Sequence, residues 1–148
     1  MLFRSERAVT LHCYGVFLAA AKRWREAEEQ LREAIRLHSA DYTPYVNLGN
    51  LLRDRNRLKE AEEAYRTALR LETNDGRIYY DLGLVLAETH RPAEAEALFR
   101  QAVALEPTDM DLLRALSDQL EQNGKREEAR TMRAQLVKRE RGGMEETP

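Results

Sequence analysis

Apolar and small residues return along this chain at a fixed interval of 34 residues. A leucine column and an alanine column keep one residue type through four intervals: Leu18, Leu52, Leu86 and Leu120, and Ala27, Ala61, Ala95 and Ala129. A glycine column, Gly15, Gly49 and Gly83, holds Ser117 in its fourth place. Agreement of several columns at one period is typical of repeat proteins, in which each interval forms one supersecondary unit.

Each interval contains two stretches whose apolar positions follow the spacing of a single helix face. In the second interval, apolar residues from Tyr45 to Leu52 precede a polar turn at 54–57, and a second apolar series runs from Ala61 to Leu71. The sequence therefore predicts an all-α fold of eight helices. These form four helix-turn-helix units at about residues 8–41, 42–75, 76–109 and 110–141.

A unit of two short helices cannot bury its apolar faces alone, so successive units are expected to stack into a solenoid. Gly49 and Ala61 mark a close approach between the two helices of one unit, and Tyr65 fills the gap toward its neighbour. Residues 1–141 are therefore expected to form a single solenoid domain. The polar segment 142–148 is expected to be a flexible C-terminal tail.

The charge balance of the chain narrows the class of partner. Lys and Arg number 24 against 26 Asp and Glu, which leaves a net charge of −2 and no basic field for nucleic acid. No apolar run approaches the roughly 18 residues that a membrane helix needs, so no membrane insertion is expected. The apolar stretch after Arg4 and Arg7 resembles a signal peptide, but it keeps the register of the repeats. We interpret it as a repeat helix and expect a cytoplasmic protein.

The columns together resemble the tetratricopeptide repeat (TPR) family, whose unit has 34 residues. The third interval carries the family pattern at Tyr79, Leu82, Gly83, Leu86, Ala95, Phe99, Ala102 and Pro107. The fourth interval departs from it, because Arg133 stands where an aromatic residue is usual. The resemblance covers about residues 8–141. It implies a right-handed α-solenoid whose first (A) helices line a concave groove, and it implies binding of proteins or peptides.

The groove that the resemblance implies would be lined by side chains of the A helices. The candidate groove residues are Asn47, Asn50, Arg53, Arg77, Tyr80, Asp81 and Arg114. Asparagine amides can both donate to and accept from a peptide backbone, and arginines can pair with acidic groups of a ligand. The alternative interpretation is a helix face that only meets solvent.

The first helix is apolar around more than one face, and no polar cap precedes it. Phe3, Leu11 and Phe17 form a candidate self-association face, through which the chain would become a homo-oligomer. Two alternatives remain open: the helix packs fully on its own second (B) helix, or the chain is a piece of a longer array.

Catalytic, metal and cofactor sites are not expected. Cys13 follows His12 directly, and neighbouring residues on a helix point about 100° apart, which does not suit a nucleophile and its base. No pair of His or Cys residues has the spacing of a helical metal site. We therefore predict a non-enzymatic interaction scaffold or adaptor that binds a peptide or helical segment in its groove. The alternatives are a self-associating structural module and a non-catalytic TPR segment of a larger enzyme or membrane assembly.

Overall fold

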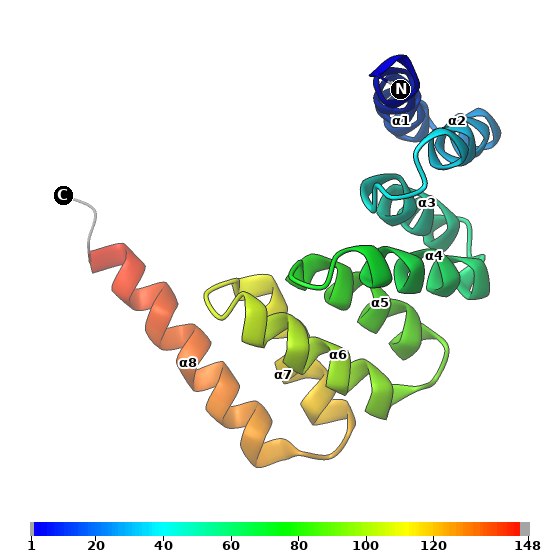
Figure 1. Cartoon of the computed structure of the whole chain (residues 1–148). Helices are drawn as coiled ribbons and strands as arrows, with labels where there is room; N and C mark the ends of the chain where they lie inside the picture. The colour runs from blue at the N-terminus through cyan, green and yellow to red at the C-terminus, as the bar shows by residue number, and fades with distance from the viewer. Residues whose placement is uncertain (1, 146–148) are drawn as a thin grey trace. The chain divides into compact units, whose positions relative to one another are not determined.

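The structure is a computed structural model that describes residues 2–145, and residues 1 and 146–148 lie outside its description. Within the described residues it contains eight α-helices and no strand, which confirms the predicted all-α fold. In chain order these are α1 (Leu2–Ala20), α2 (Trp24–Leu37), α3 (Thr43–Asp54), α4 (Leu58–Leu71), α5 (Gly76–Glu88), α6 (Pro92–Leu105), α7 (Met110–Gln122) and α8 (Arg126–Glu145). Figure 1 shows them as four successive helix-turn-helix pairs.

The chain divides into two compact units, Met1–Thr73 and Asn74–Pro148, each of which contains two repeats. We call them unit 1 and unit 2. In unit 1, α1 packs on α2 and α3 packs on α4, while α2 also packs on α3. In unit 2, α5 packs on α6, α7 packs on α8, and α6 packs on α7. Each repeat is thus stabilised by packing between its own A and B helices and by packing against the neighbouring repeat of its unit.

The glycine column allows the A and B helices of a repeat to approach closely. A Cβ at Gly49 would lie 2.7 Å from Cε1 of Tyr65, and a Cβ at Gly83 would lie 2.6 Å from Cε1 of Phe99. Both rings are buried, so neither position has space for a side chain. Ser117 is accommodated in the fourth repeat, where it donates to the Ala129 carbonyl at 3.3 Å.

The turn between the A and B helices has the same backbone conformation in every repeat. One residue of each turn has a positive φ: Lys22 (60°), Asn56 (57°), His90 (59°) and Gly124 (79°). The following residue donates its N–H to the carbonyl of the leucine column: Arg23 to Leu18, Arg57 to Leu52, Arg91 to Leu86 and Lys125 to Leu120, at 2.8–2.9 Å. This is the hydrogen bond of a Schellman motif, and it ends each A helix at the same place.

The last helix is longer than the sequence pattern indicates. α8 continues to Glu145, so residues 142–145 of the expected tail are helical, and residues 146–148 lie outside the described residues. Gly142 and Gly143 cost helix stability but keep their backbone donors, and the next proline is Pro148. Nothing before residue 146 therefore forces the helix to stop.

Candidate functional site

Unit 1 contains a cleft of about 420 Å³ between the A helices α1 and α3. Its lining residues are Val16, Ala19, Ala20, Lys22, Trp24, Leu31, Asn47, Asn50, Leu51 and Asp54. The side chains from α1 and the floor from α2 are apolar, whereas α3 contributes the two amides. This combination of an apolar pocket and a few convergent polar groups is typical of a ligand site.

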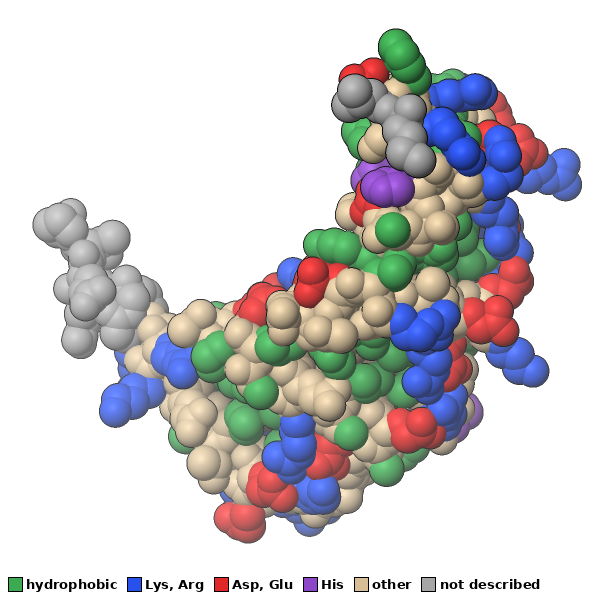
Figure 2. Space-filling view, viewed as in Figure 1, with side chains coloured by type: hydrophobic (Ala, Val, Ile, Leu, Met, Phe, Trp, Pro, Cys, Tyr) green, Lys and Arg blue, Asp and Glu red, His purple; other side chains and the backbone are tan. Residues whose placement is uncertain are grey.

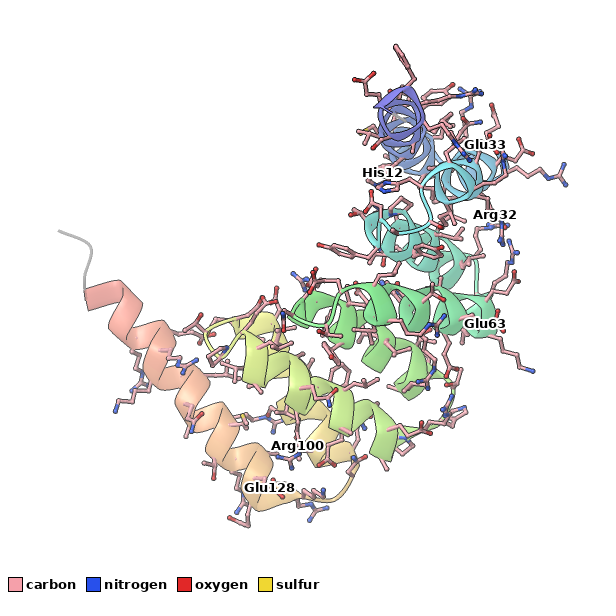
Figure 3. All side chains as sticks on the ribbon, viewed as in Figure 1. His12, Arg32, Glu33, Glu63, Arg100 and Glu128 are labelled. Carbon is pink, nitrogen blue, oxygen red and sulfur yellow. The ribbon has the colours of Figure 1, made fainter. Side chains whose placement is uncertain are left out.

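Internal hydrogen bonds fix the two amides of this cleft in opposite senses. Nδ2 of Asn47 donates to the Thr43 carbonyl at 3.2 Å and lies 2.6 Å from Nε2 of His12, which therefore accepts. Oδ1 of Asn50 accepts from the Tyr65 hydroxyl at 2.5 Å. The free group of Asn47 is thus its carbonyl oxygen, and the free group of Asn50 is its NH2. Figure 3 shows His12 on the side of α1 toward α3.

Unit 2 contains a cleft of about 350 Å³ between the A helices α5 and α7. Its lining residues are Tyr80, Leu84, Ala87, Phe99, Asp111, Arg114, Ala115, Asp118, Gln119 and Gln122. The Tyr80 ring packs on the floor residue Phe99, with ring centroids 5.9 Å apart. The Arg77 guanidinium lies over the Tyr80 ring, with its Cζ 5.3 Å from the ring centroid.

The two clefts occupy the same place in the repeat, 68 residues apart. Several pairs of lining residues match at that separation: Val16 and Leu84, Ala19 and Ala87, Leu31 and Phe99, Asn47 and Ala115, and Asn50 and Asp118. The apolar positions of Val16, Ala19 and Leu31 keep their character in unit 2, whereas Leu51 becomes Gln119 and the two amides of unit 1 become Ala and Asp. The repeat therefore forms a cleft at the same place twice, with different polar groups.

Comparison with known protein families accounts for this repetition. A model of the tetratricopeptide repeat matches residues 46–111 and again residues 80–143, and a second model of this repeat matches residues 6–74. The chain belongs to the tetratricopeptide repeat family. None of the curated proteins compared with this TPR chain matches it significantly.

Solved structures similar to this TPR chain share its fold over most of their length. YrrB, described as a TPR protein with an unusual peptide-binding site, is 26% identical with a TM-score of 0.82, over 93% of this chain and 71% of YrrB. MamA is 21% identical with a TM-score of 0.87, over 94% of this chain and 81% of MamA. The TPR domain of Arabidopsis OM64 is 26% identical with a TM-score of 0.74, over 78% of this chain and 96% of that domain.

The TPR chain distributes the seven candidate groove residues over both units. Asn47 and Asn50 line the cleft of unit 1, and Tyr80 and Arg114 line the cleft of unit 2. Arg77 does not line the unit 2 cleft, but it contacts Tyr80, which does. Arg53 and Asp81 line neither cleft, and Asp81 is only 7% exposed. Trp24 and Leu31 were missed, because they belong to a B helix and the resemblance directs attention to the A helices.

Ion pairs of the cleft rim in unit 2 involve the last helix. Arg114 pairs with Glu140 of α8, with Nη2 and Oε1 2.5 Å apart, and lies 3.5 Å from Asp111. Asp118 pairs with Arg133 of α8 at 3.3 Å. All five side chains are substantially exposed, so these pairs contribute little stability.

Ion pairs also link successive B helices at one repeated position. In unit 1, Nη1 of Arg57 lies 2.6 Å from Oε2 of Glu28. In unit 2, Lys125 pairs with Glu96 at 2.7 Å. Arg57 and Lys125 occupy the same place 68 residues apart, as do Glu28 and Glu96. Arg100 and Glu128, which are labelled in Figure 3, add a further pair between α6 and α8 at 2.6 Å.

Glu96 is the most strongly perturbed carboxyl group of these pairs. Burial by itself would raise the pKa of Glu96, but hydrogen bonds from Lys125, Asn123 and Arg100 outweigh it and lower the pKa to about 2. The carboxylate is therefore ionised at neutral pH and fully hydrogen-bonded. It ties the start of α8 to α6.

The candidate self-association face of α1 is only partly exposed. Phe3 and Phe17 are 85% and 63% exposed, whereas Leu11 is half-buried. Tyr14, which the sequence analysis did not include, is 45% exposed and stacks on Phe17 with ring centroids 6.4 Å apart. Figure 2 shows hydrophobic side chains at the surface over α1.

Among the described residues, no group of three or more His, Cys, Asp or Glu side chains is arranged to hold a metal ion. None of the described helices is both long enough and apolar enough to cross a membrane.

Proposed function

We propose that this TPR protein is an interaction scaffold whose clefts between A helices bind a peptide or helical segment of another protein. The observation that carries the proposal is the repeated cleft, in which three apolar positions match at an interval of 68 residues while the polar groups differ. A feature needed only for packing would not require an open cleft of several hundred Å³ in each unit. The likeness to YrrB, described as having a peptide-binding site, supports the same class of ligand.

The unit 1 cleft is suited to an apolar side chain next to a peptide bond. Val16, Ala19 and Leu51 would surround the side chain, and Trp24 would close one end of the cleft. The free carbonyl oxygen of Asn47 would accept from the ligand's N–H, and the free NH2 of Asn50 would donate to its carbonyl. The bonds to His12 and Tyr65 hold the amides in these orientations before the ligand arrives, which lowers the entropy cost of binding.

The unit 2 cleft is suited to a basic side chain. Asp111 and Asp118 lie at its exposed rim, and a ligand cation could take the place that the Arg77 guanidinium now holds over the Tyr80 ring. A ligand lysine or arginine would compete with Arg133 for Asp118. The two clefts therefore select different side chains while sharing one shape.

Selection of peptides by the immobilised full chain tests this proposal. Peptides from a random library displayed on phage would be enriched, synthesised and titrated into the chain by calorimetry. Val16 lines the unit 1 cleft and is 42% exposed, so a Val16→Arg substitution blocks the cleft without disturbing the core. For peptides that need an apolar anchor, we expect the affinity to fall at least about tenfold.

A matched variant separates the cleft from the general effect of a new charge. Val137 on α8 is 45% exposed and lines neither cleft. Val137→Arg should leave the affinity of the same peptides unchanged. Equal binding by the wild-type chain and the Val16→Arg variant would show that the peptides bind elsewhere, and the proposed site would be abandoned.

A further inference from the structure

The first repeat exposes a face of its A helix that the corresponding A helices of the other repeats bury. Tyr14 corresponds to Leu48 in α3 and to Leu116 in α7, at separations of 34 and 102 residues. Leu48 is 5% exposed and Leu116 is 1% exposed, whereas Tyr14 is 45% exposed. The three residues occupy one position of the repeat, so the difference lies in what covers them.

The covering element is the B helix of the preceding repeat. Within unit 1, α2 packs on α3, and Leu48 shares a cleft with Arg32 and Ile35 of α2. Within unit 2, α6 packs on α7 in the same order. By the repeat relation, Tyr14 of α1 stands where such a helix would lie. Tyr14 and its stacked neighbour Phe17 are large and aromatic, unlike the polar outer face that usually closes the end of a solenoid.

Arg23, which lies near these aromatic side chains, also lacks a partner that its counterpart in the second repeat has. Arg57 binds its own Glu60 through Nε and Nη2, and its Nη1 receives Glu28 from the preceding B helix. Arg23, at the same place in the first repeat, binds its own Glu26 through the same two atoms, at 2.8 and 2.5 Å. No other carboxylate among the described residues pairs with Arg23, and its side chain also interacts with Tyr14. One acidic partner is therefore missing next to the exposed rings.

A second copy of the chain stacked end to end does not supply this acid. The last B helix, α8, carries Arg130 at the position of Glu28 and Glu96. End-to-end stacking would place Arg130 of one copy against Arg23 of the other, and like charges at such a contact oppose association. The C-terminal repeat thus ends the series of acidic positions, while the N-terminal repeat still presents the basic one.

We propose that Tyr14, Phe17 and Arg23, together called the α1 face, dock an amphipathic α-helix of a partner protein that carries a glutamate opposite Arg23. The partner helix lies on α1 as α2 lies on α3: its apolar stripe covers the two rings, and its glutamate completes the pairing of Arg23. This surface is separate from the clefts between A helices, so the protein can hold two partners at once.

The probe for this proposal is a peptide with the sequence of residues 24–37, the helix that covers α3 in the intact chain. A covalent staple between positions 25 and 29, which are exposed in α2, keeps the peptide helical. Its binding to the full chain is followed by fluorescence anisotropy. We expect saturable binding, and replacement of an anchoring ring by Tyr14→Ser should weaken it about tenfold. Val9→Ser is the matched control, because Val9 is an exposed apolar residue of α1 that does not belong to the α1 face.

A charge exchange provides the stricter test. Arg23→Glu should weaken binding of the wild-type peptide about fivefold or more, and a peptide with Glu28→Arg should restore it, since the pair is then reversed. Absence of saturable binding, equal losses for Tyr14→Ser and Val9→Ser, or no recovery in the exchanged pair would each overturn the proposal. Light scattering across a range of concentrations tests whether the chain instead dimerises through the α1 face. A dimer that Tyr14→Ser dissociates would show that a second copy occupies the α1 face, and the partner helix would then be rejected.

Discussion

At the scale of single residues, the close spacing of the A and B helices in a repeat depends on glycines, which have no side chain. Gly83 and Phe99 belong to different helices of one repeat, and the ring occupies the space where a Cβ of residue 83 would lie. Gly49 and Tyr65 repeat this arrangement, and the Tyr65 hydroxyl then reaches Asn50 in the candidate site. A packing position and a residue that lines the unit 1 cleft are therefore connected through one tyrosine.

Substitution of Gly83 by Ala should destabilise unit 2. The new Cβ forces the Phe99 ring to shift, which costs about 1–3 kcal/mol, and the better helix propensity of alanine returns about 1 kcal/mol. We expect a net loss of about 1 kcal/mol in urea denaturation. The loss should shrink when Phe99 is replaced by Ala, because the ring atoms that the Cβ would meet are then gone, whereas a leucine at the same place in the first repeat, Leu31, lies only 2.9 Å from a Cβ at Gly15. A Gly83→Ala cost that is the same in both backgrounds would contradict this explanation.

The lowered pKa of Glu96 makes the stability of the fold depend on pH, and its direction determines the sign of that dependence. The folded pKa of about 2 lies below the ordinary value of 4.5, so the carboxylate stabilises the fold above that value. The contribution should disappear as the pH falls from about 4.5 toward 2. At neutral pH, Glu96→Gln should cost about 2 kcal/mol, and the difference from wild type should narrow in acid. Glu128→Gln is the control, because its exposed pair with Arg100 should be worth less than about 1 kcal/mol.

At the scale of elements, the turn inside each repeat demands a conformation that its residues suit unequally. The four residues with positive φ are Lys22, Asn56, His90 and Gly124. Glycine adopts this conformation without strain and asparagine tolerates it, whereas other L-residues pay about 1 kcal/mol or more. The Schellman bond that follows each turn shows that tertiary structure imposes the conformation regardless of residue type.

Replacement of Lys22 or His90 by Gly should therefore stabilise the protein by about 1 kcal/mol each, because strain is removed from a turn that keeps its hydrogen bond. Asn56→Gly should change stability by less. The gains are read as shifts of the thermal midpoint by scanning calorimetry. Gly124→Ala, the reverse change at the same place in the repeat, should lower the midpoint. If Lys22→Gly and His90→Gly both lowered it as well, strain at these positions would not be the cause.

Helices and their boundaries were largely predictable, because the period of 34 residues and the spacing of leucines and alanines are local signals. The end of α8 was not, since the Gly142-Gly143 pair suggested a tail and the helix continues through it. The candidate cleft was predictable only in part. The sequence directed attention to Asn47 and Asn50, which line the unit 1 cleft, and their role in binding stays a prediction. Their hydrogen bonds to His12 and Tyr65 join different helices, and no spacing along the chain reveals which atoms of an amide remain free.

At the scale of the whole molecule, two units present the same cleft with different polar groups. Repetition keeps the apolar lining at the positions of Val16, Ala19 and Leu31, whereas the positions of Asn47, Asn50 and Leu51 diverge. This division explains why Asn50 of unit 1 has the counterpart Asp118 in unit 2 without loss of the fold. A repeat protein can in this way acquire distinct ligand preferences while its core remains constant.

Side-chain resonances of the full chain, labelled with ¹⁵N, would show whether a peptide occupies the unit 1 cleft. A peptide selected for an apolar anchor is titrated in, and the NH2 groups of asparagine are followed. We expect the Asn50 and Asn47 signals to move with saturation, together with backbone signals around Val16, and we expect Val16→Arg to remove the shifts. Shifts confined to the charged outer faces of α2 and α4, with both asparagine signals unmoved at saturation, would contradict it.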